Sequence, residues 1–235
     1  MVTILFLNIA SMFSNAITDH LLLNMKWLGY PTEAIEFYAV MLCGCHMVLT
    51  FDRFTSAHIP IDNGIRQGEP SSMLLYLIYS HTLVAIPSSL GGDGGAYVND
   101  NFFWATCDTF DECNEKLNAM LDKQEIWSPA HNSRAEISKF KCLRLSQRTN
   151  VVCEDFHRSN SDFVIRCEDS AKLLGIIVNQ HLCWHQHAQY AIWKGENLLF
   201  TINRLTRPSF GLPAPYVQQL YRAITILTME YTLPA

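Results

Sequence analysis

The sequence has no excess of basic residues. Its 235 residues include 17 Lys and Arg against 22 Asp and Glu, which gives a formal net charge of −5 at pH 7. This balance argues against a uniformly basic coat for nucleic acid, although a charged groove can exist on an acidic protein. A nucleic-acid interface would therefore depend on local clustering of basic side chains.

A secretory signal and a membrane-spanning run are also lacking. The N-terminal apolar run has no basic residues before it and passes into Asn8. The longest apolar run, 73–87, is interrupted by polar side chains and is shorter than the roughly 20 residues of a membrane span, so we interpret it as a buried helix. With eight cysteines and no signal peptide, we expect reduced thiols in an intracellular protein, nuclear or cytoplasmic, without a membrane partner.

Zinc-ligand spacing and nucleophile triads are missing as well. Cys183, His185 and His187 stand close together, but no second Cys or His pair follows at a zinc-ligand spacing. Cys43 and Cys45 are interpreted as reduced structural thiols. No arrangement resembles a Cys-His or Ser-His-Asp nucleophile, and no internal repeat or low-complexity tract is present.

The chain does contain enough apolar residues, 49% of the total, to bury a core in one large or two small domains. Apolar residues at helical spacing predict helices at 15–28, 32–42, 70–87, 109–127, 185–205 and 214–228. Thr32 is expected to cap the second of these, and Asp108 or Thr109 the fourth.

Strands are predicted between these helices. The continuous apolar run Val2–Leu7 suits the centre of a sheet. Further strands are predicted as a pair at 47–51 and 58–61, singly at 137–145, and as a pair at 163–167 and 172–178, with 146–161 as a loop. The order is mixed α+β followed by a helical tail.

The most informative stretch is Tyr97-Val98-Asn99-Asp100, where beta-forming residues on both sides of a polar pair predict a tight hairpin. A rigid hairpin tip can hold a metal ion against a substrate if it supplies enough carboxylates. The structural alternative is a surface turn in which Asn99 and Asp100 only tolerate positive φ.

Blocks along nearly the whole chain, in order, resemble the palm and thumb of reverse transcriptases from fungal-type non-LTR retrotransposons. They are LFLNIASMF (5–13), GIRQGEPSS (64–72), YVND (97–100), EISKF (136–140), AKLLGIIV (171–178) and RLTRPSFGLP (204–213). The resemblance implies an α+β fold: a right-hand polymerase palm, with a ferredoxin-like antiparallel sheet and helices on one face, followed by a helical thumb. It places the palm and part of the fingers in 1–180 and a partial thumb in 181–235.

The resemblance implies an RNA-directed DNA polymerase, a nucleotidyltransferase that joins deoxynucleoside triphosphates to a DNA primer on an RNA template. Two divalent ions activate the primer hydroxyl and neutralise the leaving pyrophosphate. The family's ligand Asp residues align with Asn8 and Asn99, and only Asp100 is kept. Since amides carry no charge, we expect weakened Mg²⁺ or Mn²⁺ binding and impaired catalysis.

Other matched positions keep the family's residues. Phe13 aligns with the aromatic that excludes a ribose 2′-hydroxyl, and Gln67 and Gly68 align with the nucleotide-binding pair. The resemblance also implies nucleotide binding for Tyr97, the first residue of the hairpin motif, and a role as proton donor to pyrophosphate for Lys139. Taken singly, Phe13 and Tyr97 are typical core aromatics, Lys139 a solvated residue and Gln67 a loop residue.

Basic side chains on the same blocks predict a surface that follows the backbone of an RNA–DNA hybrid. They are Lys141, Arg144, Arg204 and Arg207, with Lys139, Arg148, Lys194 and Arg222 nearby in sequence.

Three functions are then possible: a retrotransposon polymerase fragment, a non-catalytic palm–thumb relic that at most binds nucleic acid, or a generic α+β interaction domain. Asn at both ligand positions favours the relic. We also expect a fingers segment before the first strand and the rest of the thumb to be absent.

Overall fold

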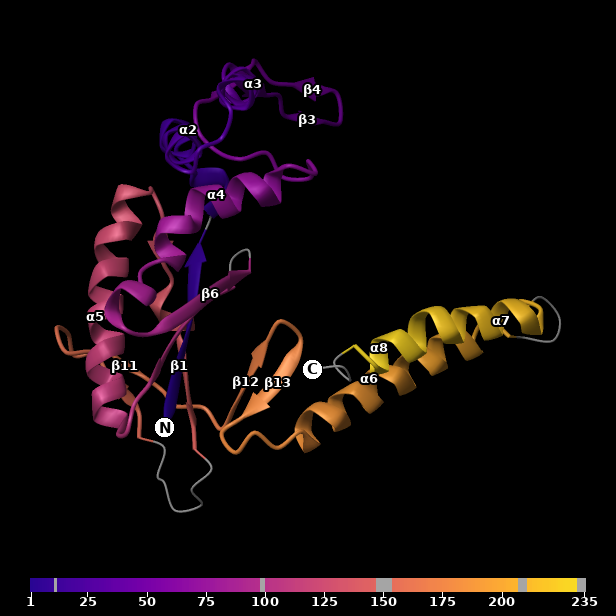
Figure 1. The fold of residues 1–235 in the computed structure, drawn as a ribbon. Coiled ribbons are helices and arrows are strands. Elements are labelled where there is room, and N and C mark those ends of the chain that lie inside the picture. Colours follow the sequence, from indigo (N-terminus) through magenta and orange to yellow (C-terminus); the bar gives the residue numbers. More distant parts are fainter. Residues whose placement is uncertain (11, 98–99, 147–153, 207–210, 232–235) are drawn as a thin grey trace. The chain divides into compact units, whose positions relative to one another are not determined.

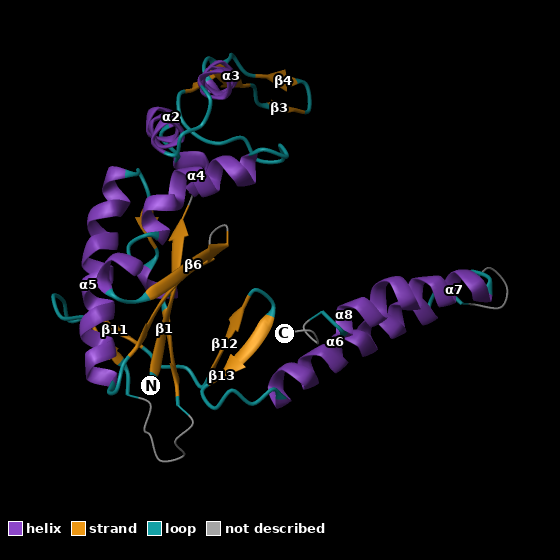
Figure 2. Cartoon of the chain, in the orientation of Figure 1, coloured by secondary structure: helices purple, strands orange, loops and turns teal. Residues whose placement is uncertain are grey.

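The computed structural model describes residues 1–10, 12–97, 100–146, 154–206 and 211–231. Helices and antiparallel strand pairs are mixed along the chain, as the sequence predicts (Figures 1 and 2). Contacts divide it into two compact units, 1–144 with 152–167, and 145–151 with 168–235. This division differs from the expected boundary at 180, because the hairpin 170–179 packs with the helix that follows it.

A five-stranded sheet forms the centre of the first unit. Its strands run in the order β6-β7-β1-β8, and β9 also pairs with β1. Their bounds are β6 Asp93–Tyr97, β7 Asp100–Thr106, β1 Val2–Ala10, β8 Arg134–Ala135 and β9 Lys141–Leu145. The predicted first strand is thus confirmed and extends to Ala10, and the predicted hairpin forms between β6 and β7.

The two faces of this sheet differ in burial because side chains alternate along each strand. Along β1, Leu5, Leu7 and Ile9 are buried and the residues between them are half-exposed. Helix α5 (Phe110–Ala130) packs on β1 and β7, and α4 (Ser72–Val84) packs on β6. Asn8 lies on the other, half-exposed face of the sheet.

The helices predicted in the first unit all form, with ends that differ by up to three residues, and two short helices at 12–15 and 88–90 were not predicted. The remaining ones are α1 Met12–Asn15, α2 Thr18–Trp27, α3 Thr32–Leu42 and the short 3-10 helix η1 Ser88–Leu90. Thr109 caps α5, since its Oγ1 accepts a hydrogen bond from the Glu112 N–H at 3.3 Å. The expected cap at Thr32 is wrong, because Pro31 holds the N-cap position and Thr32 is already helical.

Residues 72–90, α4 with its extension, are apolar and long enough to span a membrane by length and composition alone. Core helices of soluble proteins pass the same test. Here Leu75, Tyr76 and Tyr79 are buried, and the Tyr79 hydroxyl donates to the His131 carbonyl at 2.7 Å. These contacts confirm the prediction of a buried helix.

The strand pair predicted at 47–51 and 58–61 differs from the structure. In place of one pair at 47–61, β2 (Cys45–Met47) pairs with β5 (Ile59–Ile61), and β3 (Thr50–Phe51) pairs with β4 (Phe54–Thr55). Leu49 and Ser56 hydrogen-bond each other between the two pairs, which breaks the predicted strand.

The predicted pairing of 163–167 with 172–178 is wrong. Strand β11 (Val164–Ile165) pairs with β10 (Phe156–His157), inside the expected loop, and β12 (Ser170–Leu173) pairs with β13 (Ile176–Asn179). The strand expected from residue 137 begins only at 141, because 137–139 form the 3-10 helix η2.

The second unit combines the β12–β13 hairpin with a pair of helical segments. Helix α6 (His185–Asn203) packs against a segment made of α7 (Ala214–Leu220), the π-helix η3 (Tyr221–Ile226) and α8 (Leu227–Met229). Both helical segments lie where the sequence predicts them. The second one is interrupted by π-helical turns that apolar spacing does not indicate.

Candidate functional site

Asn8, Asp100 and Tyr97 form a row across three adjacent strands. Asn8 on β1 is the register partner of Asp100 on β7, which in turn is the partner of Tyr97 on β6. Directly opposed residues of antiparallel strands have Cα atoms about 4.5–5.5 Å apart and side chains on the same face. Asp100 and Tyr97 are exposed. Asn99 lies outside the described residues.

Lys139 is held beside the same strand end. The Glu136 N–H donates to the Asn8 carbonyl at 2.9 Å, and the Lys139 ammonium pairs with the Glu136 carboxylate at 2.5 Å. The Lys139 side chain remains 60% exposed. The structure therefore places Asn8 opposite Asp100 near the C-terminal end of β1, and the short helix 137–139 that carries Lys139 contacts the same strand, while their catalytic roles stay predictions.

The donors in this row do not fit a two-ion magnesium site. Asp100 offers a carboxylate and Asn8 an uncharged amide, and Glu136 is already paired with Lys139. Within the described part of the chain, no group of three or more His, Cys, Asp and Glu side chains could hold a metal ion. Divalent ions of this kind are normally held by several anionic oxygens.

Phe13 and the 64–68 loop are anchored to each other. The Phe13 carbonyl accepts from the Ile65 N–H at 2.7 Å, and the Ala16 carbonyl accepts from the Gly64 N–H at 2.8 Å. The Phe13 ring stacks on Tyr76 with centroids 4.7 Å apart, as a core aromatic would. Gln67, further along the loop, is exposed.

Gly64 and Gly68 offer a matched test of this anchoring. Both have positive φ, +113° and +95°, but a Cβ at Gly64 would lie 2.9 Å from the Ser14 carbonyl oxygen, whereas Gly68 faces open space. Strained backbone costs about 1–3 kcal/mol per residue. We expect Gly64→Ala to lose more unfolding free energy in urea than Gly68→Ala; equal losses would show that the loop does not rest on α1.

Arg144 is a correction to the predicted nucleic-acid surface. Its side chain is buried, with only 3% exposed. The guanidinium donates to the Asn114 Oδ1 and the Asp155 carbonyl, both at 3.3 Å, and lies 4.7 Å from the centre of the Phe110 ring. Arg144 is therefore unavailable to a phosphate and holds the sheet to α5.

The other predicted basic residues are distributed over the chain. Lys141 is exposed on β9 of the first unit, and Arg204 is exposed at the end of α6 in the second unit. Arg207 lies outside the described residues. One continuous surface is thus not established for them.

A basic aromatic cluster in the second unit was not predicted. The Lys172 ammonium donates to the Tyr190 hydroxyl at 3.0 Å, the Lys194 ammonium lies 4.9 Å from the Tyr190 ring centre, and the ring stacks with Trp193 at 6.1 Å. The hydrogen bonds from Lys172 and then Lys194 lower the pKa of Tyr190. Helical spacing could have joined Tyr190, Trp193 and Lys194, but Lys172 comes from β12.

No protein-family model and no curated protein matches the sequence. Among solved structures, the chain is similar to apo telomerase from Candida tropicalis, truncated from the C-terminal domain. The TM-score is 0.54 at 9% sequence identity, and the match covers 77% of this chain and 35% of that chain. Telomerase of the same organism with a TWJ fragment of telomeric RNA gives 0.49 at 9% identity, over 99% of this chain and 38% of that chain. The first of these likenesses shows that the chain has a polymerase-like fold, similar to part of telomerase, an enzyme related to reverse transcriptases.

Proposed function

We propose that this chain is the palm and partial thumb of a reverse transcriptase of the non-LTR retrotransposon type, with strongly impaired nucleotide addition. The polymerase-like fold supports the class. The ordered sequence blocks, the catalytic hairpin among them, support the retrotransposon type, and this part of the proposal goes beyond the likeness to telomerase.

The sheet order supports the palm assignment. Strands β1, β6, β7 and β9 stand in the order β6-β7-β1 with β9 on the other side of β1. Helix α4 lies within the connection from β1 to β6, and α5 lies within the connection from β7 to β9. This is the order of a ferredoxin-like βαββαβ sheet.

The observation that carries the proposal is the opposition of Asn8 and Asp100 on the half-exposed sheet face. Residues from separate sequence blocks meet there with Lys139 nearby, as the family's chemistry requires. The same pairing supports impaired catalysis, because the uncharged amide of Asn8 lies opposite the carboxylate of Asp100. Phe13 and Gln67 belong to one anchored region in which a deoxynucleoside triphosphate would bind, with an RNA template and a DNA primer as partners.

Primer extension tests the proposal. The chain is incubated with an RNA template, a DNA primer, deoxynucleoside triphosphates and Mg²⁺ or Mn²⁺, beside a variant carrying Asn8→Asp and Asn99→Asp. Extension by the variant and little or none by the original chain is the expected result. Equal extension by both would contradict the impairment.

A second candidate is a non-catalytic chain that binds nucleic acid, and the cluster of Lys172, Tyr190, Trp193 and Lys194 favours it. Exposed aromatic rings stack on bases, while ammonium groups beside them attract phosphates. The Trp193 side chain is 58% exposed, so a base could reach it. Such binding needs no metal ion.

Replacing Lys172 and Lys194 together by Ala is expected to weaken binding of a fluorescent single-stranded oligonucleotide about tenfold. The slope of log affinity against log salt should fall by about one for each lysine. Anisotropy titrations at several salt concentrations measure both quantities. Lys26→Ala with Lys123→Ala, on exposed helical positions of the first unit, is the matched control, and an equal loss in the control would contradict the assignment.

A further inference from the structure

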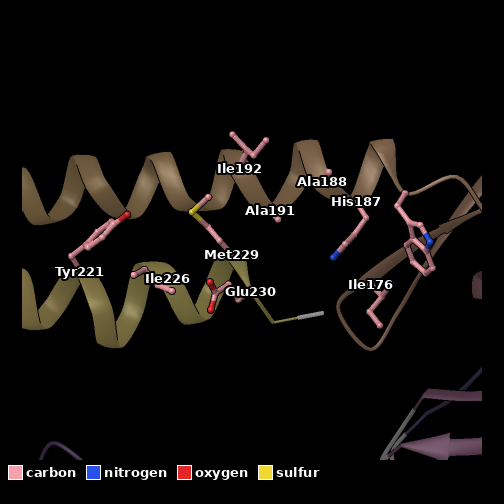
Figure 3. Close-up of a pocket in the computed structure, with 10 residues that line it drawn as sticks. Ile176, His187, Ala188, Ala191, Ile192, Tyr221, Ile226, Met229 and Glu230 are labelled. Atoms are coloured by element: carbon pink, nitrogen blue, oxygen red, sulfur yellow. The ribbon is translucent and has the colours of Figure 1, made fainter. Parts of the chain in front are cut away.

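We propose that the second unit binds small apolar cations in a cavity between α6 and the C-terminal helical segment. The cavity has a volume of about 650 Å³, within the range of roughly 300–1,000 Å³ that small-molecule sites occupy. As Figure 3 shows, Ala188 and Ala191 line it from α6, Tyr221 and Ile226 from the opposite segment, and Ile176 from the neighbouring hairpin.

The cavity follows from the side-chain sizes along α6. At Gly195 the two helical segments are in close contact, since an added Cβ would lie 2.4 Å from the Met229 Sδ. Ala191 and Ala188 stand one and two turns earlier, on the same side of α6. Their methyl groups are too short to fill the space that opens beyond Gly195, so a cavity that is partly open to solvent remains between the helices.

An unusual backbone forms the opposite wall. Tyr221 and Ile226, which both line the cavity, are the first and last residues of the π-helix η3. π-Helical turns are rare, and they occur often at functional sites. This feature is independent of the cavity volume and points to the same place.

The charged group in the lining favours a cationic ligand. Glu230 contributes a carboxylate, and none of the described residues that line the cavity is Lys or Arg. The His187 Nδ1 accepts a hydrogen bond from the Ile177 N–H at 3.2 Å. The lining thus carries the carboxylate of Glu230 on a wall made mostly of apolar side chains.

Aromatic rings add to the preference for a cation. Trp184 and Tyr221 both line the cavity, and the Trp184 ring meets His187 edge to face at 6.5 Å. An ammonium group over such rings is attracted by their negative faces. A protonated arylalkylamine, with its amine near Glu230 and its ring between the helices, satisfies both the charge and the apolar wall.

Three matched probes test the proposal on the full chain: 2-naphthylmethylammonium, the neutral 2-naphthylmethanol and 2-naphthalenesulfonate. Isothermal titration calorimetry is expected to give an affinity for the ammonium at least tenfold above that for the sulfonate. Glu230→Gln should remove most of this preference and leave the binding of the alcohol unchanged.

Variants with a larger side chain inside the cavity test whether the ammonium binds there. Ala191→Phe is expected to abolish binding of the ammonium, whereas Gln189→Phe, which adds the same ring at an exposed position of α6 outside the cavity, should retain it. Far-ultraviolet circular dichroism checks that both variants keep their helices. If Ala191→Phe unfolds, Ala188→Leu fills the same cavity with a smaller group.

Three results would overturn the proposal: equal affinity for all probes, binding that survives a folded cavity-filling variant, or a dimer in sedimentation experiments that excludes the ammonium, since a second copy would then occupy the site. None of these measurements depends on polymerase activity. A failure of amine binding would therefore leave the proposed polymerase function untouched.

Discussion

Restoring aspartate at both Asn8 and Asn99 is expected to raise primer extension in Mg²⁺ at least about 100-fold. Unit charges 4 Å apart interact by about 4 kcal/mol at an effective dielectric constant of about 20. Desolvation cancels most of this attraction between each restored carboxylate and the metal ion. If about 1.4 kcal/mol per carboxylate remains to lower the activation barrier, each restored Asp raises the rate tenfold, and the two together raise it a hundredfold. Gel-resolved extension products measure the change.

Thermal melting with and without Mg²⁺ tests metal binding without measuring catalysis. Asp at position 8 would stand directly opposite Asp100, and like charges opposed on a sheet destabilise it. The double variant should therefore melt at a lower temperature than the original chain without metal and recover when Mg²⁺ is added. The original chain should show little response to Mg²⁺.

Asp100→Asn in the double variant is the control, because it removes the one carboxylate that the natural sequence keeps. It is expected to lower extension again while leaving binding of the hybrid intact. If the double variant binds the hybrid but extends no primer, the amides are not the limiting defect and the proposal of an impaired metal site is contradicted.

Replacing Phe103 by Ala is expected to cost about 3–5 kcal/mol of unfolding free energy, a large share of the roughly 5–15 kcal/mol that a domain possesses. Phe103 is 1% exposed and is the register partner of Leu5 in the centre of the sheet. Removing its ring leaves a cavity beneath α5. Urea unfolding, followed by circular dichroism, measures the loss.

Phe102→Ala provides the matched control on the preceding residue of the same strand. Phe102 faces the half-exposed side, where its ring stacks on Trp104 at 5.7 Å. Because less of its surface is buried, we expect a loss of about 1–2 kcal/mol. Equal losses for the two variants would mean that both faces of the sheet are covered to the same extent.

Several elements of this protein could be derived from local sequence alone. The apolar run at 2–7, the helix at 32–42 and the Thr109 cap of α5 all depend on residues within a few positions of one another. Periodicity and capping act over this range, so the prediction and the structure agree there.

Strand pairing lies beyond that range. The segments at 156–157 and 164–165 are too short to show alternation, and they become strands only by pairing with each other. Arg144 looks like a surface cation in the sequence, yet contacts from α5 and Asp155 bury it. Contacts between distant residues outweigh local preference in both cases.

The sequence by itself determined which residue types are available for chemistry: one hairpin carboxylate, amides at Asn8 and Asn99, and a lysine at 139. Only the tertiary structure decided that Asn8 stands opposite Asp100, that Arg144 reaches Asn114, and that Lys172 reaches Tyr190. The physical reason is that strand register and helix packing, which join residues far apart in the chain, follow from the burial of the whole core.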